Sequence, residues 1–335
     1  MSAASPEIPH VSVVLRSYNR IPALCELIDL MLVQQRDDFE VIVIEQTTVP
    51  VSEEEQARLD ELARAPRLRI LKFPPLGGPG AFNAGARAAR GEIIMYMDDD
   101  DLPLTDQWIT QMLRGFEDPD CMAVNGRYLV SGGRPPSRLE VWLARRWVLG
   151  YMPLLKWQVA MTYGDRRRKV YSLHGGNIAV RRELLERTGL WDECASIEEE
   201  LSFCYRFLQR RRPREYFLFD PKALMLRRFD VQGGMDRRYL PVMDHARKHF
   251  DFVHNIIAHY FPLRFVLLYP VYFVAVASAT LGGTLWNPAS VRSLPTKLLG
   301  SLGFLAVFPL MWVGWLARLA VDRLRHGPPV HDPRL

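Results

Sequence analysis

Four consecutive aspartates, Asp98 to Asp101, follow directly on an apolar run at 92–97. The β-branched and large apolar residues of the run predict a buried strand. In an open α/β sheet, ligands bind just beyond the carboxyl ends of the strands, and adjacent carboxylates repel one another unless a cation or water relieves the charge. The aspartates therefore predict either a site for Mg²⁺ or Mn²⁺ or a solvated acidic turn that opens a helix at Pro103.

Strand and helix patterns alternate along the first hundred residues. Strand patterns lie at 11–15, 39–45, 68–73 and 92–97, and helix patterns at 22–31, 53–61 and 81–89. A glycine-rich turn at 77–80 precedes the third helix pattern. This alternation predicts an α/β fold with a Rossmann-like, doubly wound, mainly parallel sheet.

Composition narrows the class of protein. The chain has 335 residues, 48% of them apolar, and a formal net charge of +5. Its four cysteines show no paired spacing, which argues against a zinc site or a disulfide framework. The first apolar run is too short for a signal peptide, and no nucleic-acid-binding module is recognisable, so we expect no nucleic-acid partner.

A basic stretch at 134–169 contains several large aromatic residues, among them Trp142, Trp147 and Trp157. Basic, aromatic segments of this kind can lie in a membrane interface, where this one could present a lipid-linked acceptor. A solvated loop with buried tryptophans explains the pattern equally well.

Two stretches near the carboxyl end, 265–286 and 298–317, contain no charged residue. Each is long enough to cross a hydrocarbon core of roughly 30 Å, so the pair predicts two transmembrane helices; the alternative is a buried or re-entrant helical hairpin. Basic residues outside the pair predict that the globular domain faces the cytoplasm. The expected organisation is a globular domain at 1–230, interfacial linker helices at 231–262, transmembrane helices at 263–320 and a cytoplasmic tail at 321–335. The expected location is therefore the cytoplasmic membrane, as a multi-pass protein.

A series of motifs resembles glycosyltransferase family 2 over about residues 11–230. The motifs are 11–20, 77–85, 97–101, 175–182, 189–193 and 198–206. The resemblance implies the GT-A fold and an inverting, metal-dependent transfer of a sugar from a nucleotide-sugar donor, expected to be a UDP-sugar. It also implies Mn²⁺ or Mg²⁺ as cofactor.

The resemblance also assigns donor-side roles. Ser17, Tyr18 and Arg20 would line the nucleotide pocket, Glu45 would contact the base or ribose, and Asn83 would contact the donor. The residue before Asn83 is often Arg in the family but is Phe82 here, which removes one donor contact.

Within the acidic run, the family's DXD motif falls on Asp98 and Asp100 as metal ligands, with Asp98 or Asp99 touching ribose. A register that uses Asp99 and Asp101 instead remains open. Where many relatives have a histidine, this chain has Arg227 and Arg228, either of which could neutralise a leaving diphosphate.

The catalytic base is expected in the helix that begins near 198. Alignment with the family favours Glu200, with Glu199 as the alternative. Such a carboxylate would remove the proton of the acceptor hydroxyl, opposite the leaving group as inversion requires; helix capping is the alternative reason for acids at this place. The turn Gly175, Gly176 and Asn177 would lie beside the acceptor.

These inferences predict a membrane-anchored glycosyltransferase of polysaccharide biosynthesis, acting on a lipid-linked glycan at the cytoplasmic face. A polyprenyl-phosphate monosaccharide transferase is the nearest alternative. A non-catalytic nucleotide-sugar-binding scaffold and a soluble nucleotidyltransferase are alternatives of other classes. The sequence leaves the sugar, the acceptor and the oligomeric state open.

Overall fold

The structure is a computed structural model. It describes residues 10–132, 135–148, 163–170, 172–193, 199–228 and 231, together with isolated helical residues between 310 and 324. A nine-stranded sheet, with strand order β3-β2-β1-β4-β8-β6-β9-β5, forms the centre of the described part, and β7 pairs with β9 beside this path.

The first half of the sheet is parallel, as the sequence predicts. It consists of β1 (Val11–Ser17), β2 (Phe39–Glu45), β3 (Leu68–Lys72) and β4 (Ile93–Asp98). Because helices cover both faces, β2 is buried along its whole length and β1 and β4 along nearly all of theirs, which explains their continuous apolar sequences.

Three helices connect these strands: α1 (Ile21–Leu32), α2 (Glu53–Leu62) and α3 (Gly77–Ala88). Helix α2 begins at a capping box formed by Ser52 and Glu55, which satisfies free backbone donors of its first turn. The glycines at 77–80, predicted to be a separate turn, are the first turn of α3 itself. Further along, a Cβ atom on Gly85 would lie 2.2 Å from Val14 Cγ1, so glycine is what lets α3 approach β1.

The second half of the sheet is mixed, so the prediction of a mainly parallel sheet was wrong beyond β4. Strands β8 (Ile178–Arg181), β6 (Cys121–Val130), β9 (Tyr216–Arg227), β5 (Asp101–Pro103) and β7 (Arg168–Val170) form it. Antiparallel ladders join β4 to β8, β8 to β6, β5 to β9 and β7 to β9, while β6 and β9 run parallel. These strands lack the regular strand–helix alternation from which parallel pairing was inferred.

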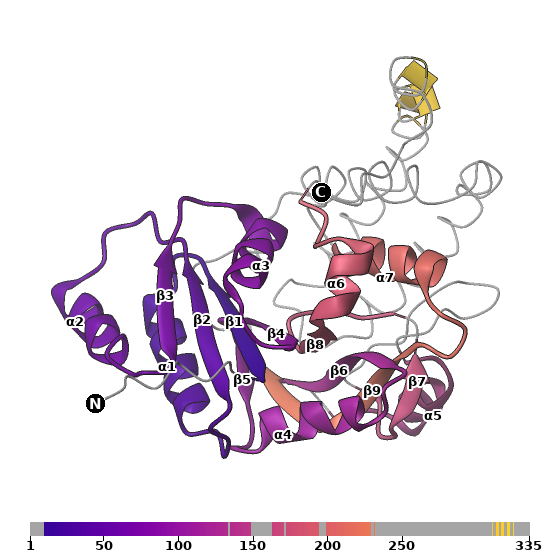
Figure 1. Cartoon of the computed structure of the whole chain (residues 1–335), viewed down its shortest axis with the longest axis horizontal. Helices are drawn as coiled ribbons and strands as arrows, with labels where there is room; N and C mark the ends of the chain where they lie inside the picture. The colour runs from indigo at the N-terminus through magenta and orange to yellow at the C-terminus, as the bar shows by residue number, and fades with distance from the viewer. Residues whose placement is uncertain are drawn as a thin grey trace, which may run out of the picture.

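The remaining helices flank this mixed half. They are α4 (Trp108–Leu113), the 3₁₀ helix η1 (Arg114–Glu117), α5 (Arg138–Trp147), α6 (Arg182–Thr188) and α7 (Glu199–Arg210). Helices α3, α6 and α7 lie on one side of the sheet, and α4 and α5 on the other (Figure 1). The ring of Trp191, in the loop after α6, packs 5.2 Å from Tyr96 on β4 and 4.8 Å from Phe203 on α7, and so ties α7 to the sheet.

Several sequence expectations concern segments that lie wholly or partly outside the described residues. The linker at 231–262, the membrane pair at 263–320 and the tail at 321–335 are described only at residue 231 and at the isolated positions between 310 and 324. No helix in the described part of the chain is both long enough and apolar enough to cross a membrane. Of the basic stretch, the structure describes α5, where Trp142 is 49% exposed, and residues 163–170.

Candidate active site

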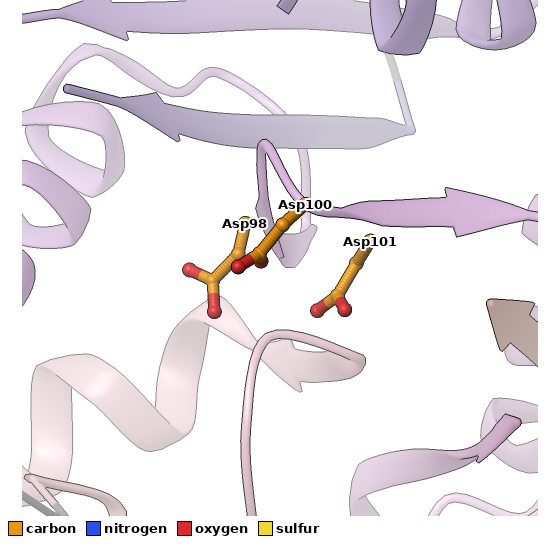
Figure 2. A group of neighbouring side chains, drawn as sticks. All are labelled: Asp98, Asp100 and Asp101. Carbon is orange, nitrogen blue, oxygen red and sulfur yellow. The ribbon is translucent and has the colours of Figure 1, made fainter. Parts of the chain in front are cut away.

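The four aspartates lie where β4 ends and β5 begins, at the carboxyl edge of the parallel half. Asp98 closes β4 and Asp101 opens β5. Because residues from Asp101 to Pro103 form a strand paired with β9, the predicted alternative of a helix beginning at Pro103 was wrong. Figure 2 shows the carboxylates of Asp98, Asp100 and Asp101 directed to the same side of this turn, with Asp98 and Asp100 next to each other.

Three arginines compensate the charge of the aspartates. Arg16 Nε donates to Asp98 Oδ1. Arg20 Nη1 donates to Asp99 Oδ1 at 2.8 Å and to Asp100 Oδ2 at 3.0 Å. Arg227 binds Asp101 through Nε at 2.8 Å and Nη2 at 2.6 Å. Arginine side chains from β1, from β9 and from the loop before α1 therefore relieve the repulsion within the acidic run.

Sequence reasoning missed Arg16. It stands one residue before Ser17 in β1, opposite Asp98 in the parallel register of β1 and β4. A charged side chain near the end of an otherwise buried strand was the signal that could have found it. Burial alone would lower the pKa of Arg16, but Asp98 and Glu199 outweigh burial and raise the pKa above its usual range.

The acidic cluster can offer a metal three carboxylate oxygens. Ligand atoms of Asp98, Asp100 and Asp101 all lie within 4.8 Å of one another, and hard oxygen donors of this kind suit Mg²⁺ or Mn²⁺. Asp101 is fully buried and bound by Arg227 through both oxygens, whereas the side chains of Asp98 and Asp100 remain 19% and 24% exposed. Asp98 and Asp100, although paired with Arg16 and Arg20, therefore have the more accessible carboxylates of the three.

The register that uses Asp99 and Asp101 fits less well. Asp99 is 4% exposed. It accepts a hydrogen bond from Ser17 Oγ at 2.8 Å as well as the one from Arg20. Burial raises the pKa of Asp99 to about 6, although the Arg20 charge opposes this. Its carboxylate holds the β1 loop against the β4–β5 turn.

Most residues predicted to line the nucleotide pocket gather at this edge. Ser17 pairs with Glu45 in the β1–β2 register, and Glu45 accepts a hydrogen bond from the backbone amide of Thr47. Tyr18 is 38% exposed. Asn19 has a positive φ of 57°, a conformation that Asn tolerates better than most residues, and this turn directs Arg20 back to the aspartates.

Asn83 lies in α3 and faces the loop after α6. It is 1% exposed, its Nδ2 donates to the Trp191 carbonyl at 2.8 Å and to Glu193 Oε1 at 2.7 Å, and its Oδ1 accepts from the Trp191 amide at 2.9 Å. Both ends of the amide are thus engaged in linking α3 to the loop after α6. Asn83 therefore has a structural role in this link, and the donor contact stays a prediction.

The two predicted catalytic glutamates open α7 and have different surroundings. Glu199 accepts a hydrogen bond from Arg16 Nη1 at 2.9 Å. Glu200 accepts one from the backbone amide of Gly175 at 2.8 Å. Burial, and then the negative charge of Glu199, raise the pKa of Glu200 to about 8. A carboxyl with a pKa near the working pH is suited to proton transfer.

The turn at 175–177 brings the acidic cluster and α7 together. Gly175 has a φ of 73°, and a Cβ atom on Gly176 would lie 2.8 Å from the Asp98 backbone nitrogen. Only glycines allow this approach. Asn177 is fully buried, with Nδ2 bound to the carbonyls of Arg127 and Ala223 and Oδ1 accepting from the Trp108 indole, so its side chain fixes the turn.

The two arginines at the end of β9 also differ. Arg227 is committed to Asp101 and donates to the Tyr128 hydroxyl at 2.9 Å. Arg228 donates from Nη1 to Glu26 at 2.6 Å, whereas its Nε and Nη2 have no partner among the described residues. Arg228 therefore has hydrogen-bond donors to spare for an anion, and Arg227 holds the cluster together.

Several known proteins are similar to this chain. It is 36% identical over 113 residues to the uncharacterized glycosyltransferase YwdF of Bacillus subtilis, a match that covers 33% of this chain and 39% of that protein. It is 31% identical over 99 residues to the succinoglycan biosynthesis protein ExoO of Rhizobium meliloti, covering 29% of this chain and 27% of that protein. The chain thus spans well under half the length of these curated relatives.

A solved structure has the same fold. The mannosyltransferase PcManGT from Pyrobaculum calidifontis, in complex with GDP-Man and Mn²⁺, superposes with a TM-score of 0.53 at 20% identity, over 95% of this chain and 88% of that one. The fold around the acidic turn is thus that of known GT-A-like glycosyltransferases. The sequence model of glycosyl transferase family 2 matches residues 12–189. Since this match covers more than half of the chain, the protein belongs to glycosyltransferase family 2.

Proposed function

We propose that this protein is an inverting, metal-dependent glycosyltransferase that moves a sugar from a nucleoside-diphosphate-sugar to a glycan acceptor. One observation carries the proposal. The backbone amide of Gly175 donates to the Glu200 carboxylate, and the next residue, Gly176, packs directly against Asp98. The proposed proton acceptor and the acidic cluster thus lie on either side of one short turn.

Each part of the site has a task in this proposal. Ser17, Tyr18, Arg20 and Glu45 bind the nucleotide, and Asp98 and Asp100 would hold a divalent cation, which supplies Lewis-acid stabilisation of the departing diphosphate when bound. Arg228 has the spare donors to bind phosphate oxygens. Glu200 removes the proton of the acceptor hydroxyl as that oxygen attacks the anomeric carbon.

Inversion follows from where the base would lie. A single displacement places the nucleophile and its base on the face of the sugar opposite the leaving group. Glu200 comes from α7, while the diphosphate-binding groups come from β1, β4 and the end of β9. The proposal places Glu200 and the diphosphate-binding groups on opposite faces of the sugar, as direct displacement without a covalent intermediate requires.

The acceptor we propose is a lipid-linked glycan of polysaccharide biosynthesis, used at the cytoplasmic face of a membrane. The charge-free stretches at 265–286 and 298–317 support an anchor there, and the name of ExoO associates a relative with polysaccharide biosynthesis. The donor is expected to be a UDP-sugar, with GDP-sugars as the principal alternative because PcManGT holds GDP-Man.

A donor screen tests the proposal. Purified full-length protein in detergent is incubated with UDP-, GDP- and dTDP-sugars, with and without Mn²⁺, and release of nucleoside diphosphate is measured. Polyprenyl phosphate and a lipid-linked disaccharide serve as acceptors in separate arms. We expect metal-dependent release from one donor, with transfer to the disaccharide; transfer to polyprenyl phosphate alone would replace the proposed acceptor.

Variants make the screen specific. Asp100→Asn should abolish metal-dependent release. Asp60→Asn, which changes an exposed aspartate of α2, should not affect it.

Proton nuclear magnetic resonance of the product gives the anomeric configuration. Retained configuration would refute inversion, and tight donor binding without any turnover by the wild-type protein would indicate a non-catalytic scaffold.

A further inference from the structure

Arg16 connects the two sets of carboxylates that the proposed reaction uses. Its Nε donates to Asp98 on β4, and its Nη1 donates to Glu199 on α7, 2.9 Å away. Asp98 belongs to the acidic cluster that could hold a metal, and Glu199 directly precedes the proposed base, Glu200. One planar guanidinium therefore spans the gap between the sheet edge and the first turn of α7.

Helix α3 encloses the same guanidinium. Its central carbon lies 3.9 Å from the centroid of the Phe82 ring, within the range of a favourable cation–π contact. A Cβ atom on Gly78 would lie 2.5 Å from Arg16 Nη1, so the absence of a side chain at 78 makes room for the guanidinium. Contacts from β4, α7 and α3 together fix its position.

A lysine could not reproduce this arrangement. The two acids are bound by different nitrogens of one rigid plane, and that plane also stacks on an aromatic ring, whereas an ammonium is a single point charge on a flexible stem. The Arg16 side chain is only 20% exposed and the Glu199 side chain 9%. Water is therefore a poor substitute for the lost contacts.

We propose that Arg16 is a positioning residue, which, seated on Phe82, sets the separation between Asp98 and Glu199 and thereby the distance between the donor site and Glu200. The inference rests on the proposed function. Its physical consequence is that loss of the guanidinium removes the direct ion-paired connection between the β4–β5 turn and α7, so that their separation depends on the remaining contacts at Gly175 and Trp191. A misplacement of about 1 Å between reacting groups costs on the order of 100-fold in rate.

Moving the guanidinium to another element provides the sharpest test. Arg16→Lys keeps the charge, and Arg16→Met removes it. The double variant Arg16→Met, Phe82→Arg supplies a guanidinium from α3 instead, next to the place that the Arg16 guanidinium occupies in the wild-type protein. Arg187→Lys is the matched control, because Arg187 also binds a buried glutamate, Glu215, through two nitrogens but lies outside the site.

We expect Arg16→Lys to melt cooperatively, at a temperature below that of the wild-type protein, and its folded form to show kcat/KM for donor and acceptor reduced about 100-fold. The combined variant should recover at least about tenfold over Arg16→Met, and Arg187→Lys should keep wild-type kinetics. Wild-type kinetics in Arg16→Lys, or no recovery in a folded combined variant, would overturn the inference.

A binding arm separates this inference from the proposed function. Calorimetry measures the affinity of each variant for UDP and for GDP in the presence of Mn²⁺, which needs no turnover. If the wild-type protein transfers no sugar, the proposed function fails, and the inference then depends on this arm alone. Weaker nucleotide binding by Arg16→Lys than by Arg187→Lys supports it, and equal binding overturns it.

Discussion

The carboxylate of Glu200 accepts a hydrogen bond from the backbone amide of Gly175 at 2.8 Å. This contact joins the first turn of α7 to the turn that presses on Asp98. It also distinguishes the two neighbouring acids, because Glu199 is bound by a charged arginine and Glu200 by a neutral amide. A carboxylate without a cationic partner is the better proton acceptor of the two.

Replacing Glu200 by Gln should therefore lower kcat by about 10²- to 10⁴-fold, the usual contribution of a general base, while nucleotide affinity stays within about threefold. Kinetics and calorimetry on the same preparation check both statements. Glu183→Gln is the control, because Glu183 is an exposed acid in the first turn of α6. If Glu183→Gln lowers kcat as much as Glu200→Gln does, the effect comes from the loss of an acid in a first helical turn rather than from the loss of a general base.

The rate should rise with pH through about pH 8. The pKa of Glu200 is raised to about 8 by burial and by Glu199, so the deprotonated base becomes more populated as the pH increases. Glu199→Gln removes the like charge and should shift the midpoint to lower pH. A pH profile of kcat that falls above pH 7, or the same midpoint in Glu199→Gln, would contradict the assignment.

The same shift affects stability. The pKa of Glu200 is higher in the folded protein than the ordinary value of about 4.3 for an unfolded chain, so folding favours the protonated form. Its contribution to stability is present at low pH and is lost as the pH rises from about 4 to 8. Thermal melting should show a smaller decline over this range in Glu200→Gln than in the wild-type protein.

Arg227→Met should destabilise the fold by about 3–5 kcal/mol, because it leaves the fully buried Asp101 without its cation. Adding Asp101→Asn should restore part of the loss, since the remaining group is then neutral. Denaturant unfolding measures the differences. Arg58→Met, which breaks an exposed ion-pair network on α2, should have little effect.

Asn83→Ala should lower stability by about 1–3 kcal/mol, because the buried backbone carbonyl and amide of Trp191 lose their partner. The Michaelis constant for the donor, measured on the folded fraction, should stay close to the wild-type value. A large rise in that constant without a change in melting temperature would instead restore the donor contact that the sequence motif implies.

Sequence reasoning predicted the parallel half of the fold well, because β1, β2 and β4 are continuous apolar runs separated by amphipathic helices. It gave the wrong pairing for the second half. Strands such as β5 and β7 have three residues each, too few for a periodic pattern, and their partners lie far along the chain. Their direction depends on long-range pairing that no local signal records.

For the site, motif order located the acidic run, the glycine turn and the two glutamates. It could not assign charge partners. Arg16 and Asp98 are 82 residues apart in the chain and meet only because β1 and β4 are neighbours in register. The buried amides of Asn83 and Asn177 brace loops in the structure, a role that sequence alone could not reveal, because a bracing amide and a ligand-binding amide belong to the same residue type.

The four-residue ladder between β4 and β8 has an evolutionary consequence. On the parallel side of this ladder lie Ser17, Arg20 and Glu45, which we propose bind the nucleotide. On the mixed side lie the turn before β8 and helix α7, which carry Gly175 and the proposed base Glu200. If these assignments hold, we expect mutations that remodel acceptor choice to fall on a different stretch of the chain from those that maintain donor chemistry. We expect lineages of this family to diversify their glycans by drift on the mixed side, with the parallel side inherited largely unchanged.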